Sequence, residues 1–131
     1  MKKDIDIPVV KNVYIAVVQE YSGIYKTTDW NAYIINDKDV ALEMILIVTR
    51  GYDENRGTST MRHKLENLPP KSYAKIELVQ EEVLELNNEF IVTYFEDNKM
   101  YDKTFLFRRN TINERALQQI PLMKLKGVLV K

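Results

Sequence analysis

Residues 90–107 decide the fold class, and their sequence is FIVTYFEDNKMYDKTFLF. Two runs in this stretch, residues 90–95 and 100–107, are rich in the aromatic and β-branched residues that favour strands. The runs are joined around Asp97 and Asn98, and an Asn tolerates the left-handed backbone of a tight turn. The stretch therefore predicts an antiparallel β-hairpin.

A second hairpin is predicted for residues 30–48. Its first strand places Trp30, Ala32 and Ile34 on one face. Its second strand places four further apolar residues on one face, namely Leu42, Met44, Leu46 and Val48. Between the strands, residues 36–39 are Asn-Asp-Lys-Asp, whose side chains bond nearby backbone in turns. We therefore expect the two strands to pair directly.

Two other segments predict strands in different positions of a sheet. Residues 13–18 are apolar on both alternating faces, which indicates a central strand. In residues 61–65 the alternation includes Arg62 and Lys64, which is typical of an edge strand guarded by positive charge. The proline pair at 69–70 should end that strand, because proline has no backbone donor.

Residues 73–86 fit two patterns. The apolar residues at 74, 76 and 78 alternate as in a strand, whereas those at 76, 79, 83 and 86 recur at helical spacing. Because the neighbouring segments favour strands, we expect a strand through Val79. A helix is the alternative for residues 80–86.

One short helix is expected near the C-terminus. Thr111 and Glu114 have the spacing of a capping box, in which each side chain bonds the other's free backbone amide. The helix would begin near Ile112, continue through residues 115–119 and end before Pro121. Residues 127–130 would add a last short strand.

These elements predict a mainly β fold in a single domain spanning residues 1–131. The length of 131 residues is near the usual size of one domain, and no repeat or linker divides it. Short antiparallel strands at regular spacing favour an antiparallel β-sandwich, immunoglobulin-like, with one short C-terminal helix.

Composition and charge exclude several classes of protein. The 19 basic and 19 acidic residues cancel, so a global positive field for nucleic acid is missing and nucleic-acid binding is not favoured. The absence of cysteine fits a reducing compartment, and we expect a cytoplasmic protein. Two aspartates and a proline interrupt the first eight residues, which argues against a secretion signal, and no apolar stretch approaches the ~20 residues of a membrane span.

Catalytic and metal chemistry is poorly supplied. His63 is the single histidine, so a metal site with two or more histidines is not predicted. A serine triad is not predicted either, because His63 is not accompanied by a nucleophile motif of the Gly-x-Ser-x-Gly kind. Asp37 and Asp39 lack the further ligands and glycine of a calcium loop, and they favour a turn. We therefore expect no catalytic residue, no metal ligand and no cofactor.

Charged and aromatic residues in loop-like segments are the candidate interaction residues. Residues 50–58 are polar and contain two glycines, which predicts a loop, and a tyrosine in a loop offers contact area with a polar tip. The candidates are Arg50, Tyr52, Arg56, Arg62, His63, Arg108 and Arg109.

Charge is also unevenly ordered along the chain. Residues 77–97 contain seven acidic residues and no lysine or arginine, whereas residues 103–131 are mostly basic among their charged positions. Segregated charge allows a neutral protein to pair with a charged partner or with itself. If the chain self-associates, we expect these two segments to contribute.

Four segments resemble a family of short bacterial proteins of unassigned function: residues 30–36 (WNAYIIN), 81–90 (EEVLELNNEF), 110–114 (NTINE) and 126–129 (KGVL). The similarity spans the whole chain. Some members are labelled phenylalanyl-tRNA synthetase alpha subunit, a label that implies aminoacylation with ATP and tRNA. A catalytic subunit of that enzyme has a large antiparallel active-site domain with arginine-bearing motifs, and the chain shows none of these features, so the resemblance supplies no catalytic residue.

The leading hypothesis from the sequence is a non-catalytic protein-interaction module whose partner is another protein, with a homo-oligomer as one option. An RNA- or translation-associated accessory domain, using the basic C-terminal third, is the alternative. An enzyme with a carboxylate-based site is the second alternative.

Overall fold

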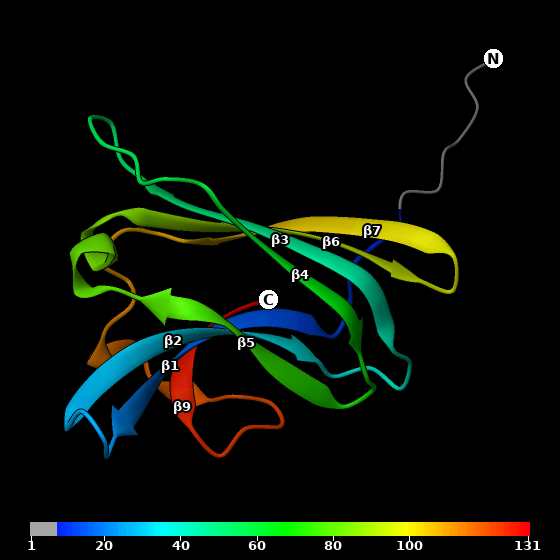
Figure 1. Ribbon diagram of the computed structural model, residues 1–131, viewed down its shortest axis with the longest axis horizontal. Helices are drawn as coiled ribbons and strands as arrows, with labels where there is room; N and C mark the ends of the chain where they lie inside the picture. Colours follow the sequence, from blue (N-terminus) through cyan, green and yellow to red (C-terminus); the bar gives the residue numbers. More distant parts are fainter. Residues whose placement is uncertain (1–7) are drawn as a thin grey trace.

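Two antiparallel sheets form the two layers of the molecule in the computed structural model, which describes residues 8–131 (Figure 1). The five-stranded sheet has the order β5 (Ser72–Val79), β2 (Thr27–Asn36), β1 (Val13–Ser22), β9 (Lys126–Val130) and β8 (Gln118–Gln119). The four-stranded sheet has the order β4 (Met61–Leu68), β3 (Leu42–Tyr52), β6 (Asn87–Glu96) and β7 (Lys99–Phe107). The predicted mainly β, antiparallel class is confirmed. Seven of the first eight residues, which argued against a secretion signal, lie outside the described residues.

The core lies between the two sheets, where alternate residues of each strand point inward. Val13, Ile15 and Val17 of β1 belong to the same buried cluster as Phe90 and other aromatic residues of β6 and β7. The predicted central position of residues 13–18 is confirmed, because β1 has β2 on one side and β9 on the other. Its opposite face is also buried.

The predicted hairpin of residues 90–107 is confirmed as β6 and β7, which pair from Asn88 with Phe107 to Glu96 with Lys99. Asp97 and Asn98 form the turn with φ angles of 50° and 60°. Both angles lie in the left-handed region that two-residue hairpin turns require.

The predicted hairpin of residues 30–48 is wrong, although both of its strands exist. β2 belongs to the five-stranded sheet and β3 to the four-stranded sheet, so residues 37–41 cross from one layer to the other. The side chain of Asn36 fixes this crossover, because its fully buried Nδ2 donates to the carbonyl oxygens of Val40, Leu68 and Pro69 at 2.9–3.2 Å. These carbonyls come from both inter-sheet connections at this end of the sandwich.

A bulge in β3 also changes which of its residues face the core. The pairing of β3 with β6 shifts between Glu43 and Leu46, and Met44 has a φ angle of 49°. Ile45 and Ile47 are therefore buried, while Leu46 and Val48 lie on the opposite, half-exposed face. The expectation that Leu42 shares a face with them is wrong, because one extra residue reverses the alternation.

The segments from β4 to β6 follow the expected pattern. β4 is an edge strand that ends at the proline pair, and β5 continues through Val79, as predicted. Residues 81–85 then form one short 3-10 helix, η1 (Glu81–Glu85), and not a continuation of the strand.

The expected C-terminal helix is reduced to one 3-10 turn, η2 (Glu114–Ala116). Asn113 caps this turn by accepting from the backbone amide of Arg115 at 2.9 Å, while the Thr111 hydroxyl donates to the Arg108 carbonyl, so the capping box is not formed. The reason is packing. Ile112 lies in the core between the sheets, whereas Ile120 lies against the outer side of the five-stranded sheet, so this segment must pass around an edge.

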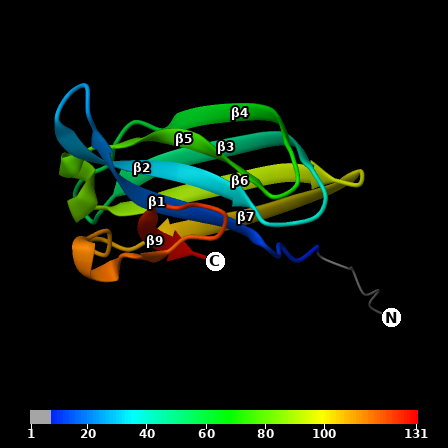
Figure 2. The same cartoon turned by 90° about the horizontal axis from the view of Figure 1, so that it is seen from below.

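The outer face of the five-stranded sheet is therefore partly covered by the chain itself. Ile120 and Met123 form a second buried cluster with Ala16, Val18 and Ile35 from β1 and β2. Figure 2 shows this C-terminal segment beside β1 and β9. In residues 8–131, no helix has the length and apolar character needed to cross a bilayer.

Candidate functional site

Several of the predicted interaction residues lie at the end of the sandwich where β3 finishes. The guanidinium carbon of Arg50 lies 5.0 Å from the centre of the Tyr52 ring, close enough for a cation–π interaction. The Nε of Arg50 also donates to Glu89 Oε1 of the adjacent β6 at 2.8 Å. The charge of Arg50 is thus already matched within the chain.

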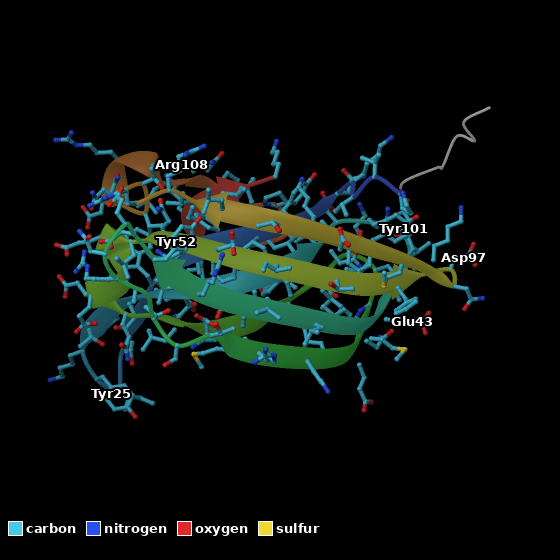
Figure 3. All side chains as sticks on the ribbon, turned by 90° about the horizontal axis from the view of Figure 1, so that it is seen from above. Tyr25, Glu43, Tyr52, Asp97, Tyr101 and Arg108 are labelled. Carbon is cyan, nitrogen blue, oxygen red and sulfur yellow. The ribbon has the colours of Figure 1, made fainter. Side chains whose placement is uncertain are left out.

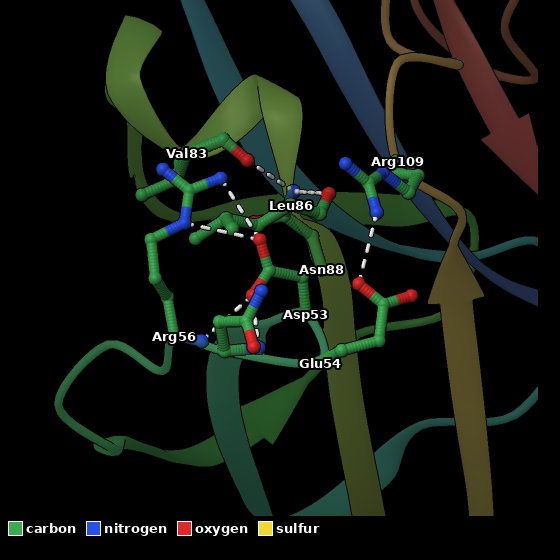
Figure 4. Close-up of polar contacts among 8 residues, drawn as sticks. Asp53, Glu54, Arg56, Val83, Leu86, Asn88 and Arg109 are labelled. Carbon is green, nitrogen blue, oxygen red and sulfur yellow. Dashed lines mark hydrogen bonds and ion pairs between the residues drawn. The ribbon is translucent and has the colours of Figure 1, made fainter.

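The loop after β3 is organised by Asp53 (Figure 4). One carboxylate oxygen accepts from the backbone amides of Asn55 and Arg56 at 2.8 and 2.7 Å, and the other accepts from Arg56 Nε and Nη2 at 3.0 and 2.9 Å. These hydrogen bonds hold the pKa of Asp53 below its usual range, and the bond from the Asn55 amide contributes most. Arg56 is therefore engaged in shaping its own loop.

Arg109 connects this loop to the segment after β7. Its Nη1 lies 3.3 Å from Glu54 Oε2, and its backbone amide donates to the side chain of Asn87 at 3.0 Å. The neighbouring Asn88 is buried and donates to the carbonyls of Val83 and Leu86, which closes η1 (Figure 4). Side-chain bonds therefore join three segments at this end of the sandwich.

The structure brings together five of the candidate residues and separates the other two. Arg50, Tyr52, Arg56, Arg108 and Arg109 lie at this end, and Figure 3 shows Tyr52 and Arg108 there. Arg62 is exposed on the outer side of β4, whereas His63 points between the sheets. Three of the four arginines at the loop end pair with carboxylates, so this cluster offers little free positive charge to an anionic partner.

His63 belongs to a small polar cluster between the two sheets. Its Nε2 lies 2.7 Å from Glu77 Oε1, and the hydroxyl of Thr49 donates to the same oxygen at 2.8 Å. Glu77 reaches this inward position because the pairing of β5 with β2 shifts by one residue, which places Glu77 opposite the core residue Ala32. The cluster connects β3 and β4 of one sheet to β5 of the other.

This cluster lacks the arrangement of a nucleophilic site. Thr49 and His63 both bond the same oxygen of Glu77, and no hydrogen bond joins the hydroxyl to the imidazole in the described residues. A nucleophile needs such a bond to its base. Thr49 and Glu77 do line a cleft of about 400 Å³, but no group of three metal-binding side chains occurs in residues 8–131.

A second cleft, of about 430 Å³, lies beside η1 and contains Trp30, Asp29, Glu81 and Glu82. Glu81 and Glu82 are exposed, as expected for a solvated charged face. The neighbouring carboxylates of Glu81 and Glu82 thus lie on the exposed side of a 3-10 helix.

The most distinctive surface is the outer face of the four-stranded sheet, which Figure 3 views directly. Its middle is apolar and only half-buried, and it consists of Leu46, Val48, Ile91, Phe95 and Leu106, with Thr93 among them. An antiparallel sheet with one solvated face normally alternates apolar residues inside with polar residues outside. Here β3 and β6 are apolar on both faces.

The two outer faces of the sandwich therefore differ. Ile120 and Met123 cover part of the outer side of the five-stranded sheet. Among residues 8–131, no segment covers the outer side of the four-stranded sheet with a buried cluster of this kind. We call this apolar middle, together with the exposed residues Arg62, Lys64, Met100, Asp102 and Thr104 on the two edge strands, the outer face. Contiguous apolar surface that is open to solvent is a common feature of protein interaction sites.

Sequence reasoning missed the outer face, although a signal for it exists. Residues 44–48 are MILIV, and residues 90–92 are FIV, so both alternating faces carry apolar residues. That pattern predicts a strand buried on both sides.

Comparison with models of protein families and with curated proteins gives no match, so the geometry alone characterises the site.

Proposed function

We propose that this chain is a non-catalytic protein-interaction module that docks a partner on the outer face. The observation that carries the proposal is the apolar, half-buried middle of the four-stranded sheet, centred on Val48 and Ile91. Removing apolar surface from water stabilises a complex by ~25 cal/mol per Å². Side chains held on the strands of a sheet also lose little backbone entropy when they bind a partner.

The cations at the loop end are engaged within the chain and give little support to RNA binding there. Arg50, Arg56 and Arg109 each pair with a carboxylate, and electrostatic binding to a phosphate backbone would require those three cations to be free. A carboxylate-based enzyme has less support, because Glu77 accepts hydrogen bonds from one threonine and contacts one histidine through a single oxygen.

We further propose that the sandwich is immunoglobulin-like. Such domains place strands A, B and E in one sheet and C, F and G in the other. The order β1, β2, β5 and the order β3, β6, β7 match these two sets when the strands are taken in chain order. In this assignment β4 extends the sheet beside strand C, and β8 and β9 are additions beside strand A.

Affinity capture with surface variants tests the proposed function. Tagged wild-type chain, Ile91→Glu and the control Lys75→Glu would be incubated with native lysate, and the retained proteins identified. Ile91 is half-exposed on the outer face, and Lys75 is exposed on β5 of the other sheet. We expect at least one protein to be retained by the wild type and the control but lost by Ile91→Glu, and identical recovery by all three folded chains would contradict the proposal.

A further inference from the structure

We infer that the partner that fits the outer face is a second copy of this chain, placed face to face by a two-fold axis parallel to the strands. This inference rests on the proposed function, because it names the partner of the same surface. It follows from the register of the four strands and from the charges at their two edges.

The pairing of the strands arranges the outer face in rows across the sheet. One row contains Arg62, Val48, Ile91 and Thr104, in the order β4, β3, β6 and β7. The next row contains Lys64, Leu46, Thr93 and Asp102 in the same order. A cation thus stands at the β4 edge of these two rows, and a polar or acidic residue stands at their β7 edge.

A two-fold axis that runs parallel to the strands, between β3 and β6, makes these rows self-complementary. Rotation about this axis places β4 of one copy over β7 of the other and β3 over β6, while each residue stays at its own height along the strands. Val48 then faces Ile91 of the second copy, and Lys64 faces Asp102 of the second copy. Both contacts occur twice in the dimer.

The edge charges are free to make these contacts. Lys64 and Asp102 are exposed, and neither forms an ion pair in residues 8–131. They stand three strand spacings apart in one sheet, about 14 Å, so they cannot pair within a copy. A second copy in the proposed orientation supplies the missing partner for each.

The size of the face sets the strength of the dimer. Four strands about 4.8 Å apart, with about eight residues of 3.3 Å each, give an area on the order of 500 Å² per copy. The two copies together bury on the order of 1,000 Å², which is the range of weak, transient protein complexes. We therefore expect a dimer that depends on concentration.

Sedimentation equilibrium of charge variants tests the inference. Lys64→Asp places two aspartates opposite each other at both edges of the dimer, and Asp102→Lys places two lysines there. Each single variant should raise the dimer dissociation constant about tenfold, since each dimer loses two ion pairs and gains two like-charge contacts. The double variant restores opposite charges and should return to within about threefold of the wild type.

The control is Lys75→Asp, which makes the same charge change on the five-stranded sheet and should leave the dissociation constant unchanged. The inference is overturned if the wild type is monomeric at all concentrations, if a single reversal has no effect, or if the double variant is no tighter than the single ones. If the dimer experiment fails but Ile91→Glu still loses a protein that the wild type captures, the proposed function stands and only the dimer is rejected. If Ile91→Glu also captures the same proteins as the wild type, the proposed function and the dimer are both rejected.

Discussion

Two tyrosines show how the same group can stabilise or destabilise this fold according to its partners. The hydroxyl of Tyr33 donates to Glu20 Oε1 at 2.7 Å. The hydroxyl of Tyr94 is buried without a hydrogen-bond partner in the described residues, although its ring stacks on Tyr101 with 5.2 Å between ring centres. Burial raises the pKa of both hydroxyls, for Tyr33 with a further contribution from Glu20.

Replacing each tyrosine by phenylalanine should therefore change stability in opposite directions. Tyr94→Phe removes an unsatisfied buried hydroxyl and keeps the ring, so we expect the free energy of unfolding to rise by about 1 kcal/mol. Tyr33→Phe removes a hydrogen bond and should lower it by about 1 kcal/mol. Urea unfolding measures both, and a Tyr94→Phe variant that is less stable than the wild type would show that its hydroxyl has a partner.

At the scale of elements, the attachment of β9 to β1 depends on close approach at Gly127. A Cβ atom at this position would lie 2.6 Å from the carbonyl oxygen of Val17 and 2.8 Å from Cγ1 of Val18. The backbone of β1 would have to shift, because neither contact can be relieved by the far end of a flexible side chain. Residue 127 is therefore restricted to glycine by its neighbour in the sheet.

Gly127→Ala should lower the free energy of unfolding by about 2 kcal/mol or more, as expected when a packed region is overfilled. The matched control is Gly23→Ala in the turn between β1 and β2, where an added Cβ meets nothing within 4 Å. Chemical denaturation of the two variants gives the comparison. Equal stability of Gly127→Ala and the wild type would contradict the pairing of β9 with β1.

The strands were largely predictable from the sequence, but their partners were not. Alternation is a local property, so the hairpin of β6 and β7, the edge strand β4 and the end of β5 at Val79 could all be predicted. A turn within a sheet and a crossover between sheets use the same polar residues, however. The contacts of Asn36 with Leu68 and Pro69, which help to fix residues 37–41 as a crossover, join residues far apart along the chain.

For the candidate site too, local features could be predicted from the sequence, whereas contacts between distant segments could not. Arg50 and Arg56 could be found as cations from the sequence, but the predicted loop of residues 50–58 is wrong for Arg50 and Tyr52, which lie in β3. The carboxylates that pair with the two arginines depend on the fold or on loop geometry. The outer face was missed because one bulge at Met44 decides whether Leu46 and Val48 face the core. The resemblance to short bacterial proteins stays a prediction.

At the scale of the whole molecule, the fold brings parts of the acidic and basic segments together. β6 and β7 pair with each other, so residues 88–96 of the acidic segment 77–97 lie beside residues 99–107, which include the start of the basic segment 103–131. Glu77, Glu89 and Glu96 also contact His63, Arg50 and Lys38, which lie outside the basic segment. The arrangement that remains suited to self-association is the pair of opposite charges at the two edges of the outer face.

The absence of cysteine allows the central claim to be tested with a single introduced thiol. Thr93→Cys places a thiol in the middle of the outer face, close to the proposed two-fold axis, and Lys75→Cys places one on the opposite sheet. Each variant would be treated with a short bis-maleimide and separated by denaturing electrophoresis. We expect a covalent dimer from Thr93→Cys and little from Lys75→Cys, and equal cross-linking of the two variants would contradict an interface on the outer face.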